Sequence, residues 1–293
     1  MRFGPSGNSE SFFVQGHKST IEQPKWLFDN FGLDAFEYSF GRGVRITEKS
    51  ARQIGEAFDE YGIQKSVHAP YFINLATEEE SKKQNCFKYF EQACRAAQWM
   101  GAKRVIFHPG AQGKMERAKA VDNILTFFPD ILCRLEESGL LEGITLCPET
   151  MGKLGQIGDV QEVLALCALD DRLIPCIDFG HLYARRLGEF GDYESFAEVL
   201  DEIETSLGLQ RAKKIHVHFS RIEYTKGGEK RHWNYEDQQF GPDFDPLALL
   251  FVQRDYDAVV ICESSGKMAE DAATYRDIYQ KFREAMQKNE PKM

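Results

Sequence analysis

Short apolar runs alternate with longer amphipathic stretches along most of the chain. The runs are rich in Val, Ile, Leu and Phe, which is typical of strands that are covered on both faces. With the N-terminal segment as an eighth, they predict strands within residues 1–7, 33–40, 64–70, 103–110, 143–150, 173–181, 213–220 and 258–264. The amphipathic stretches predict helices over 47–62, 81–101, 115–139, 158–170, 192–208 and 268–287. This alternation predicts an α/β fold, a (β/α)₈ TIM barrel, and we assign residues 1–293 to a single domain.

Two segments interrupt the regular pattern. Pro129 lies inside the predicted helix 115–139, where we expect a kink or a break because proline lacks the backbone N–H and clashes with the preceding turn. Residues 221–244 are polar and too long for a plain connection, so we expect a loop. Loops of this length are usually functional or disordered.

Composition narrows the class of protein. The 293 residues include 36 Lys and Arg against 46 Asp and Glu, a net charge of −10, and 42% are hydrophobic, as in an ordered globular protein. No apolar run approaches the roughly 20 residues of a membrane span, and the N-terminus has no basic-then-apolar pattern. We therefore expect a cytoplasmic protein without a membrane partner. So acidic a chain would bind nucleic acid only through a locally positive face or bound metal ions.

Histidines and carboxylates gather at the ends of the predicted strands. Every histidine except His17 falls at a strand's carboxyl end or in the segment 221–244. In a parallel barrel these ends converge on one rim, where active sites form. Mixed imidazoles and carboxylates are what zinc or manganese prefers. The candidates are His68, His108, Glu149, Asp178, His181, His216, His218, Glu229, His232 and Glu263.

Each of these residues also has an ordinary structural explanation. A single histidine after an apolar run often packs in the core, and a single carboxylate there often caps the next helix. Together, however, so many titratable groups would repel one another or stay unpaired without a cation, so we predict a site for several metal ions. His216 and His218 share one face of their strand, and we expect one to be a ligand and the other a supporting or core group.

Six motifs follow in order over most of the chain. HAPY and FHPG are weak signals alone, whereas the E-T-x-G-x-x-x-x-x-G run followed by D-x-x-H is specific. The motifs are HAPYFINLA (68–76), VIFHPG (105–110), PETMGKLGQIGD (148–159), CIDFGHLYA (176–184), HFSRIEYTKGGEKRHW (218–233) and CESSG (262–266). In this order they resemble the endonuclease IV family of apurinic/apyrimidinic (AP) endonucleases, in a variant of archaeal type.

This resemblance implies two or three Zn²⁺ ions per chain, with Mn²⁺ also possible. His68 and His108 match the histidines of the family's first metal. Glu149 matches the carboxylate that bridges the first and second metals, and Asp178 and Glu263 match carboxylates on the second.

The histidine of the second metal has two candidates. Aligning Ser220 with the family's serine places His216 on the family's histidine, and His216 is our choice. His218 then replaces an asparagine of the family and is the alternative ligand.

The residues that match the ligands of the third metal differ from the family pattern at one position. His181 and His232 match its two histidines. Lys230 stands where the family usually has an aspartate ligand, so we expect Glu229 to replace it.

The resemblance implies hydrolysis of the phosphodiester 5′ to an abasic site, as in base excision repair. Glu149 and Glu263 would be catalytic, Glu149 by holding the metal pair and Glu263 by orienting the nucleophile. Tyr71 matches the aromatic that enters the duplex where a base is missing, although it could equally pack on the barrel. The expected partner is damaged double-stranded DNA, and the expected state is a monomer.

Two other functions remain open. A sugar isomerase or epimerase of the xylose-isomerase-like group would share the barrel, but it typically needs one or two metals held mainly by carboxylates. An inactive barrel that binds a partner would not need so complete a set of ligands.

Overall fold

Eight short strands form a closed parallel barrel in this computed structural model, which describes residues 1–289. In order around the barrel they are β1 (Arg2–Pro5), β2 (Ala35–Ser39), β3 (Gln64–His68), β4 (Arg104–Phe107), β6 (Thr145–Pro148), β8 (Cys176–Asp178), β9 (His216–Phe219) and β12 (Val259–Cys262). Two four-stranded ladders, β1–β12–β9–β8 and β2–β3–β4–β6, are joined by parallel bridges. One bridge pairs Ser6 with Glu37 and the other pairs Glu149 with Cys176. The predicted (β/α)₈ TIM barrel is therefore confirmed.

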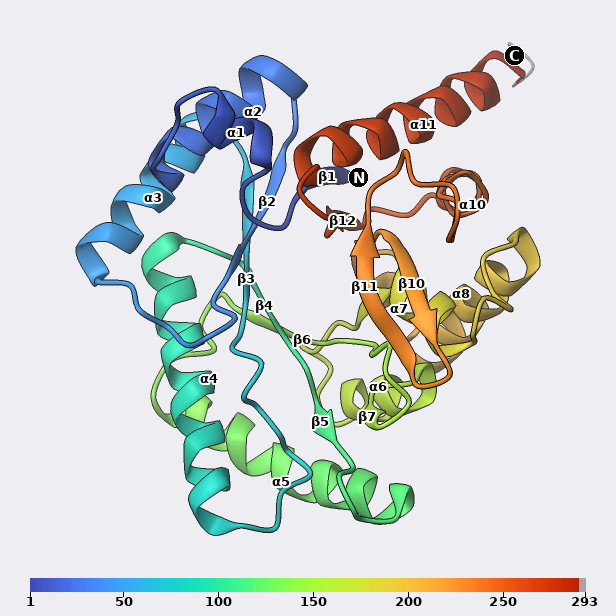
Figure 1. Cartoon of the computed structure of the whole chain (residues 1–293). Helices are drawn as coiled ribbons and strands as arrows, with labels where there is room; N and C mark the ends of the chain where they lie inside the picture. The colour runs from blue at the N-terminus through green and yellow to red at the C-terminus, as the bar shows by residue number, and fades with distance from the viewer. Residues whose placement is uncertain (290–293) are drawn as a thin grey trace.

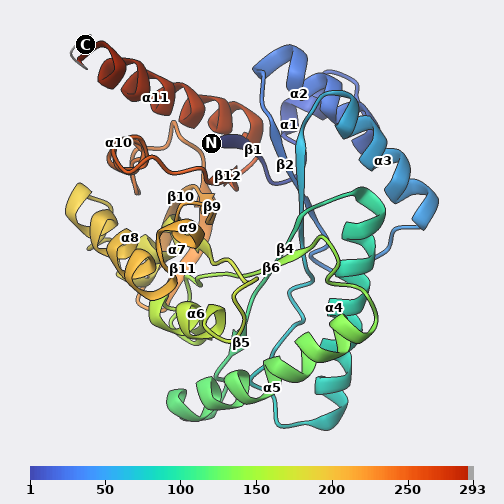
Figure 2. The same cartoon turned by 180° about the vertical axis from the view of Figure 1, so that it is seen from behind.

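Helices surround the strands in a ring, as Figures 1 and 2 show from opposite sides. The longer ones are α2 (Gln23–Phe31), α3 (Glu48–Glu60), α4 (Glu80–Met100), α5 (Arg117–Glu137), α6 (Val160–Cys167), α8 (Tyr193–Leu207), α10 (Asp245–Gln253) and α11 (Met268–Asn289). The shorter ones are α1 (Glu10–Val14), η1 (Thr20–Glu22), α7 (Phe179–Arg185) and α9 (Leu209–Ala212). No helix within the described range is long and apolar enough to cross a membrane.

The barrel strands send different side chains to their two faces. Val67, Val217 and Phe219 belong to the large apolar core under the helices. Their neighbours His216 and His218 are fully buried on the opposite face, inside the barrel, which confirms that these two histidines share a face. The inside of the barrel is consequently more polar than its outer shell.

The predicted interruption at Pro129 is corrected by the structure. Helix α5 continues through Pro129 from Arg117 to Glu137, so a break at that point is wrong. Phe127, Phe128 and Ile131 are buried on either side of the proline. Packing of this apolar face explains why the helix persists despite the missing backbone hydrogen bond.

The segment 221–244 is only partly a loop. Its first half forms an antiparallel hairpin of β10 (Arg221–Thr225) and β11 (Gly228–Trp233). A second short pair, β5 (Gly110–Ala111) with β7 (Gln156–Ile157), lies beside the same end of the barrel. The hairpin carries two of the predicted metal ligands.

Candidate metal centre

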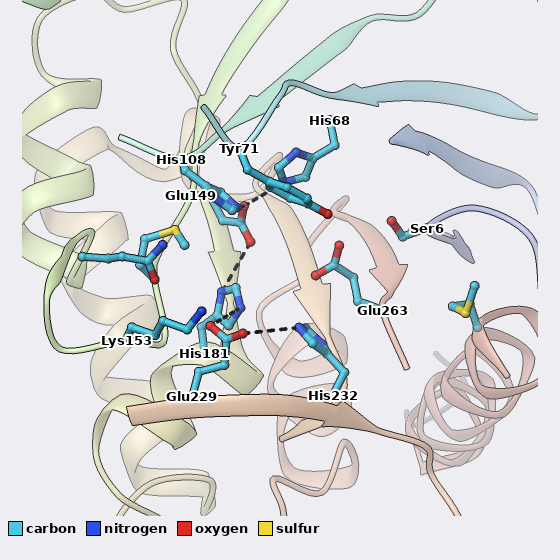
Figure 3. A pocket seen from close by; sticks show the side chains of 13 residues that line it. Ser6, His68, Tyr71, His108, Glu149, Lys153, His181, Glu229, His232 and Glu263 are labelled. Atoms are coloured by element: carbon cyan, nitrogen blue, oxygen red, sulfur yellow. Dashed lines mark hydrogen bonds and ion pairs between the residues drawn. The ribbon is translucent and has the colours of Figure 1, made fainter. Parts of the chain in front are cut away.

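A cavity of about 490 Å³ opens at the carboxyl ends of the barrel strands. Figure 3 shows its imidazoles and carboxylates turned toward one another from different elements. Its lining residues are Ser6, His68, Tyr71, His108, Glu149, Met151, Lys153, Gln156, His181, Glu229, His232, Glu263 and Met268. Three sets of metal-ligand types, here called the first, second and third groups, lie in and directly beneath this cavity. A fourth set, formed by Cys176, His216 and His218, is fully buried and does not line the cavity.

The first group consists of His68, His108 and Glu149. His68 ends β3, and His108 and Glu149 directly follow β4 and β6. The Nε2 atoms of both histidines lie 3.0 Å from Glu149 Oε2. Adjacent strands thus deliver the three side chains to one point, as expected from the sequence.

The second group consists of Glu149, Asp178, His218 and Glu263. His218 Nδ1 lies 3.2 Å from Glu149 Oε1 and 3.5 Å from Glu263 Oε2. Asp178 ends β8, and its Oδ1 accepts a hydrogen bond from the backbone N–H of His181 and so caps α7. Its other oxygen, Oδ2, is buried and accepts no hydrogen bond from the described residues. Glu149 belongs to both groups, so it is placed to bridge two ions.

The choice of His216 for the second group is not supported by the geometry. His216 lies one layer deeper in the barrel, where its Nε2 contacts Glu37 Oε2 at 3.0 Å. In the strand register His218, not His216, is level with Asp178. The alternative ligand is therefore the one brought to the carboxylates of this group.

The third group consists of His181, Glu229 and His232. Glu229 Oε2 lies 3.4 Å from His181 Nε2, and Glu229 Oε1 lies 4.0 Å from His232 Nε2. Lys230 instead pairs with Glu223 at 2.5 Å, as does its neighbour Arg231 at 2.8 Å, because the β10–β11 register shifts at this point and interrupts the alternation of side chains. The structure thus brings Glu229 to the place that we expected it to fill.

Two glycines allow the hairpin to approach the third group. A Cβ atom on Gly152 would lie 2.6 Å from Glu229 Cβ and 3.0 Å from His181 Cδ2. Gly228 has φ +91°, and a Cβ there would lie 2.2 Å from the carbonyl oxygen of Gly152. Side chains at either position would push β11 away, which gives the glycine of the E-T-x-G run a physical reason.

Hydrogen bonds on the far side of the imidazoles fix their orientation. His68 Nδ1 donates to the carbonyl of Ala69, and His181 Nδ1 donates to the carbonyl of Thr150, both at 2.9 Å. His232 Nδ1 lies 2.8 Å from Ser220 Oγ. In all three rings Nε2 is left facing the carboxylates, which is the arrangement that metal-binding histidines require.

Burial and close charges shift the pKa values of these groups. Burial alone lowers the pKa of His68, but the hydrogen bond and charge of Glu149 raise it to about 9. Burial raises the pKa of Glu149, but His108, His218 and His181 together hold it well below its usual range. In the metal-free protein some of these imidazoles therefore carry protons. Metal ions would have to displace these protons in order to bind.

The donor set fits divalent ions. Within each group the ligand atoms lie within 4.8 Å of one another, and Asp178 Oδ2, which is 3.2 Å from His181 Nδ1, accepts no hydrogen bond from the described residues and is free to bind an ion. Imidazole nitrogen and carboxylate oxygen suit zinc and manganese. The residues of the three groups would hold such ions.

Tyr71 and Lys153 border the cavity. The ring of Tyr71 stacks on His108 with centroids 5.5 Å apart, yet 57% of the residue stays exposed, so it is not packed into the barrel. Lys153 is the only Lys or Arg among the described residues that line the cavity. It was missed from the sequence, although its place between Gly152 and Gly155, after a strand, was a signal.

Comparisons with known proteins agree with this architecture. A family model described as a xylose isomerase-like TIM barrel matches residues 28–285. An uncharacterized protein of Methanocaldococcus jannaschii is 38% identical over 234 residues, which is 79% of this chain and 82% of the relative. A probable endonuclease 4 of Staphylococcus aureus is 29% identical over 246 residues, which is 77% of this chain and 79% of the relative.

Two solved structures share the fold at low sequence identity. A D-tagatose 3-epimerase-like protein superposes with a TM-score of 0.70 and 20% identity, covering 98% of this chain and 99% of that one. Endonuclease IV from Thermus thermophilus superposes with a TM-score of 0.66 and 19% identity, covering 97% of this chain and 100% of that one. These matches confirm the resemblance to endonuclease IV at the level of family and fold. The chain belongs to the xylose isomerase-like TIM barrel family, and endonuclease IV proteins are among its relatives.

Proposed function

We propose that this protein is a metal-dependent phosphodiesterase that cuts DNA at abasic sites, hydrolysing the bond 5′ to the damaged deoxyribose. One observation carries the proposal: three adjacent ligand groups surround a single cavity, and Glu149 belongs to two of them. Five imidazoles take part in these groups, more than a single-metal sugar enzyme needs.

The three groups divide the work of the site. Divalent ions bound there would lower the pKa of a water molecule and offset negative charge on the attacking and leaving oxygens of a phosphodiester. Glu149 would hold the first two ions at a fixed separation. Burial raises the pKa of Glu263, but the charge of His218 brings it to about 2. Glu263 is therefore ionised at neutral pH and can accept a hydrogen bond from an attacking water.

Two residues at the rim suit damaged DNA as the substrate. Lys153 brings a positive charge into a cavity on a protein with net charge −10, where a phosphate would meet it. The exposed ring of Tyr71 offers a surface to fill the gap left by a missing base. A nucleotide without its base costs little stacking to displace, which favours abasic sites over intact DNA. We further propose that the chain acts in the cytoplasm as a one-domain monomer.

Sugar epimerisation is the second candidate. The second group alone has three carboxylates and one imidazole, the carboxylate-rich set expected for that chemistry. The first and third groups have no role in such a reaction, and for this reason we place it second.

Cleavage and metal content together test the proposal. Purified protein loaded with zinc is incubated with a duplex that holds one tetrahydrofuran abasic analogue, and the products are separated on a denaturing gel. We expect a single cut 5′ to the analogue, loss of cutting in EDTA, and three zinc ions per chain. An intact duplex, together with turnover of a ketose and one bound ion, would show that the protein is an epimerase.

A further inference from the structure

A charged cluster lies inside the barrel directly beneath the second group. Glu37, in the middle of β2, is fully buried. Its Oε2 accepts hydrogen bonds from Ser66 Oγ at 2.8 Å and from His216 Nε2 at 3.0 Å. Its Oε1 lies 3.0 Å from His218 Nε2, an ionic contact without hydrogen-bond geometry. None of the functional assignments above uses this carboxylate.

Fold stability alone is a weak reason to keep such a cluster. Buried ion pairs can often be replaced by packed apolar residues without loss of stability, because removing charges from water costs as much as their attraction returns. Apolar side chains fill other positions inside this barrel, in the small clusters Ala35–Val259–Ile261 and Ile106–Cys147–Cys176. The position of Glu37 therefore calls for a role beyond filling space.

His218 differs from His68 and His232 in the partner of its far nitrogen. His68 and His232 are held from behind by neutral oxygens, whereas His181 Nδ1 contacts the Thr150 carbonyl and also lies 3.2 Å from Asp178 Oδ2. His218 has a carboxylate, Glu37, behind Nε2, while its Nδ1 faces Glu149 and Glu263. A proton on Nε2, drawn toward Glu37, leaves the Nδ1 lone pair free for an ion.

We propose that Glu37 is a positioning residue for His218, an inference that rests on the metal-dependent function proposed above. Glu37 selects the tautomer of His218 whose Nδ1 lone pair points into the second group. A carboxylate behind a ligating imidazole also makes the ring a stronger donor. The second ion is thereby held more tightly than Glu149, Asp178 and Glu263 alone would hold it.

His216 and Arg104 hold Glu37 from the other side. Arg104 Nη1 donates to His216 Nδ1 at 3.3 Å and to the carbonyl of Ile215 at 3.2 Å. His216 Nε2 is then the atom that carries the proton and donates to Glu37. A continuous chain of contacts thus runs from the barrel's opposite end to the second group, and it gives His216 a supporting role that differs from ligation.

Metal binding by Glu37→Gln tests the inference without any DNA. Glutamine keeps the volume of the side chain but removes its charge. Zinc affinity is measured by competition with a chromophoric chelator, and the environment of the second ion by visible absorption of the cobalt-loaded protein. We expect affinity for one of the three ions to fall about 10-fold to 100-fold, with a changed cobalt spectrum and the other two ions unaffected.

Two further variants separate positioning from folding. Glu37→Asp retains the charge and should bind zinc more tightly than Glu37→Gln. If Glu37→Gln does not fold, Glu37→Asp still tests the inference. Glu204→Gln, a half-buried glutamate on α8 that accepts from Tyr256 Oη, is the matched control and should bind zinc like the wild type. A purely structural role would lower the melting temperature of the metal-free variants and leave zinc affinity unchanged.

The outcomes distinguish this inference from the proposed function. Unchanged zinc affinity and an unchanged cobalt spectrum in folded Glu37→Gln or Glu37→Asp would overturn the role of Glu37. Wild-type protein that binds zinc but leaves abasic DNA intact would overturn the nuclease, while weakened binding in the variants would still support the positioning role. Wild-type protein that binds no ion in the second group would overturn both.

Discussion

Replacing Glu149 by glutamine should empty two of the three groups at once. The carboxylate is 1% exposed, and four imidazole nitrogens lie within 3.4 Å of its oxygens. Removing one partner of a buried charge pair costs about 3–5 kcal/mol, since the remaining charges are left uncompensated. At about 1.4 kcal/mol per factor of ten, zinc affinity at the first and second groups should fall between about 100-fold and 5,000-fold.

The third group gives this experiment an internal reference. His181, Glu229 and His232 form it without Glu149, so one zinc ion should remain bound after gel filtration. Bound zinc is counted by plasma mass spectrometry, and cleavage of the abasic duplex is followed in parallel. We expect one ion instead of three and no detectable cleavage.

A matched variant and a clear contrary result complete the test. Glu204→Gln removes a carboxylate far from the cavity and should retain three ions and full cleavage. Retention of three tightly bound ions by Glu149→Gln, or cleavage at the wild-type rate, would refute the bridging role of Glu149.

Four shorter predictions address the remaining parts of the site. Because Glu149 raises the pKa of the buried His68 from 6.5 to about 9, His68 should contribute about 3 kcal/mol to the stability of the metal-free protein at pH 6.5, and this contribution should be lost as the pH rises through 9. Urea unfolding at the two ends of this range measures the loss, and a free energy of unfolding that increases with pH would contradict it. Glu229→Gln should release only the third ion and slow cleavage about 10-fold or more, and zinc counting beside the cleavage rate checks both effects. Tyr71→Ala should raise KM for the abasic duplex roughly 5-fold to 100-fold with little change in kcat, since stacking contributes about 1–3 kcal/mol per base, and an unaltered KM would exclude contact between the ring and the DNA. Lys153→Met should reduce the slope of log affinity against log salt by about one, as the loss of one phosphate contact requires, and a slope equal to that of the wild type would exclude the contact.

The order of strands and helices followed from local patterns. Runs such as 103–110 and 258–264 are apolar because both faces of a barrel strand are covered. Consecutive apolar residues are a local feature, so these strands could be recognised from the sequence. The location of the site also followed, because strand ends in a parallel barrel meet at one rim. That argument placed His68, His108 and Glu149 at the rim, and the resemblance to the endonuclease IV family assigned them to one metal.

Other features depended on packing between distant segments. A kink or a break was expected at Pro129, and the break did not occur, because the apolar face of α5 is held against the core. The hairpin within 221–233 escaped notice because its strands are mainly polar and lack an alternating apolar face, although Arg221, Ile222 and Gly228 are buried. Glu37 stands within the apolar run 33–40, and only its distant partners His216 and His218 give it a role.

The sequence by itself determined which residue types reach the rim, and the tertiary structure decided which of them share a cation site. His216 and His218 point to the same face of β9 and differ only in depth, about 7 Å for two residues of strand. Local sequence carries no information on that depth. Closure of the barrel sets it, by placing His218 level with Asp178 and leaving His216 beside Glu37 below.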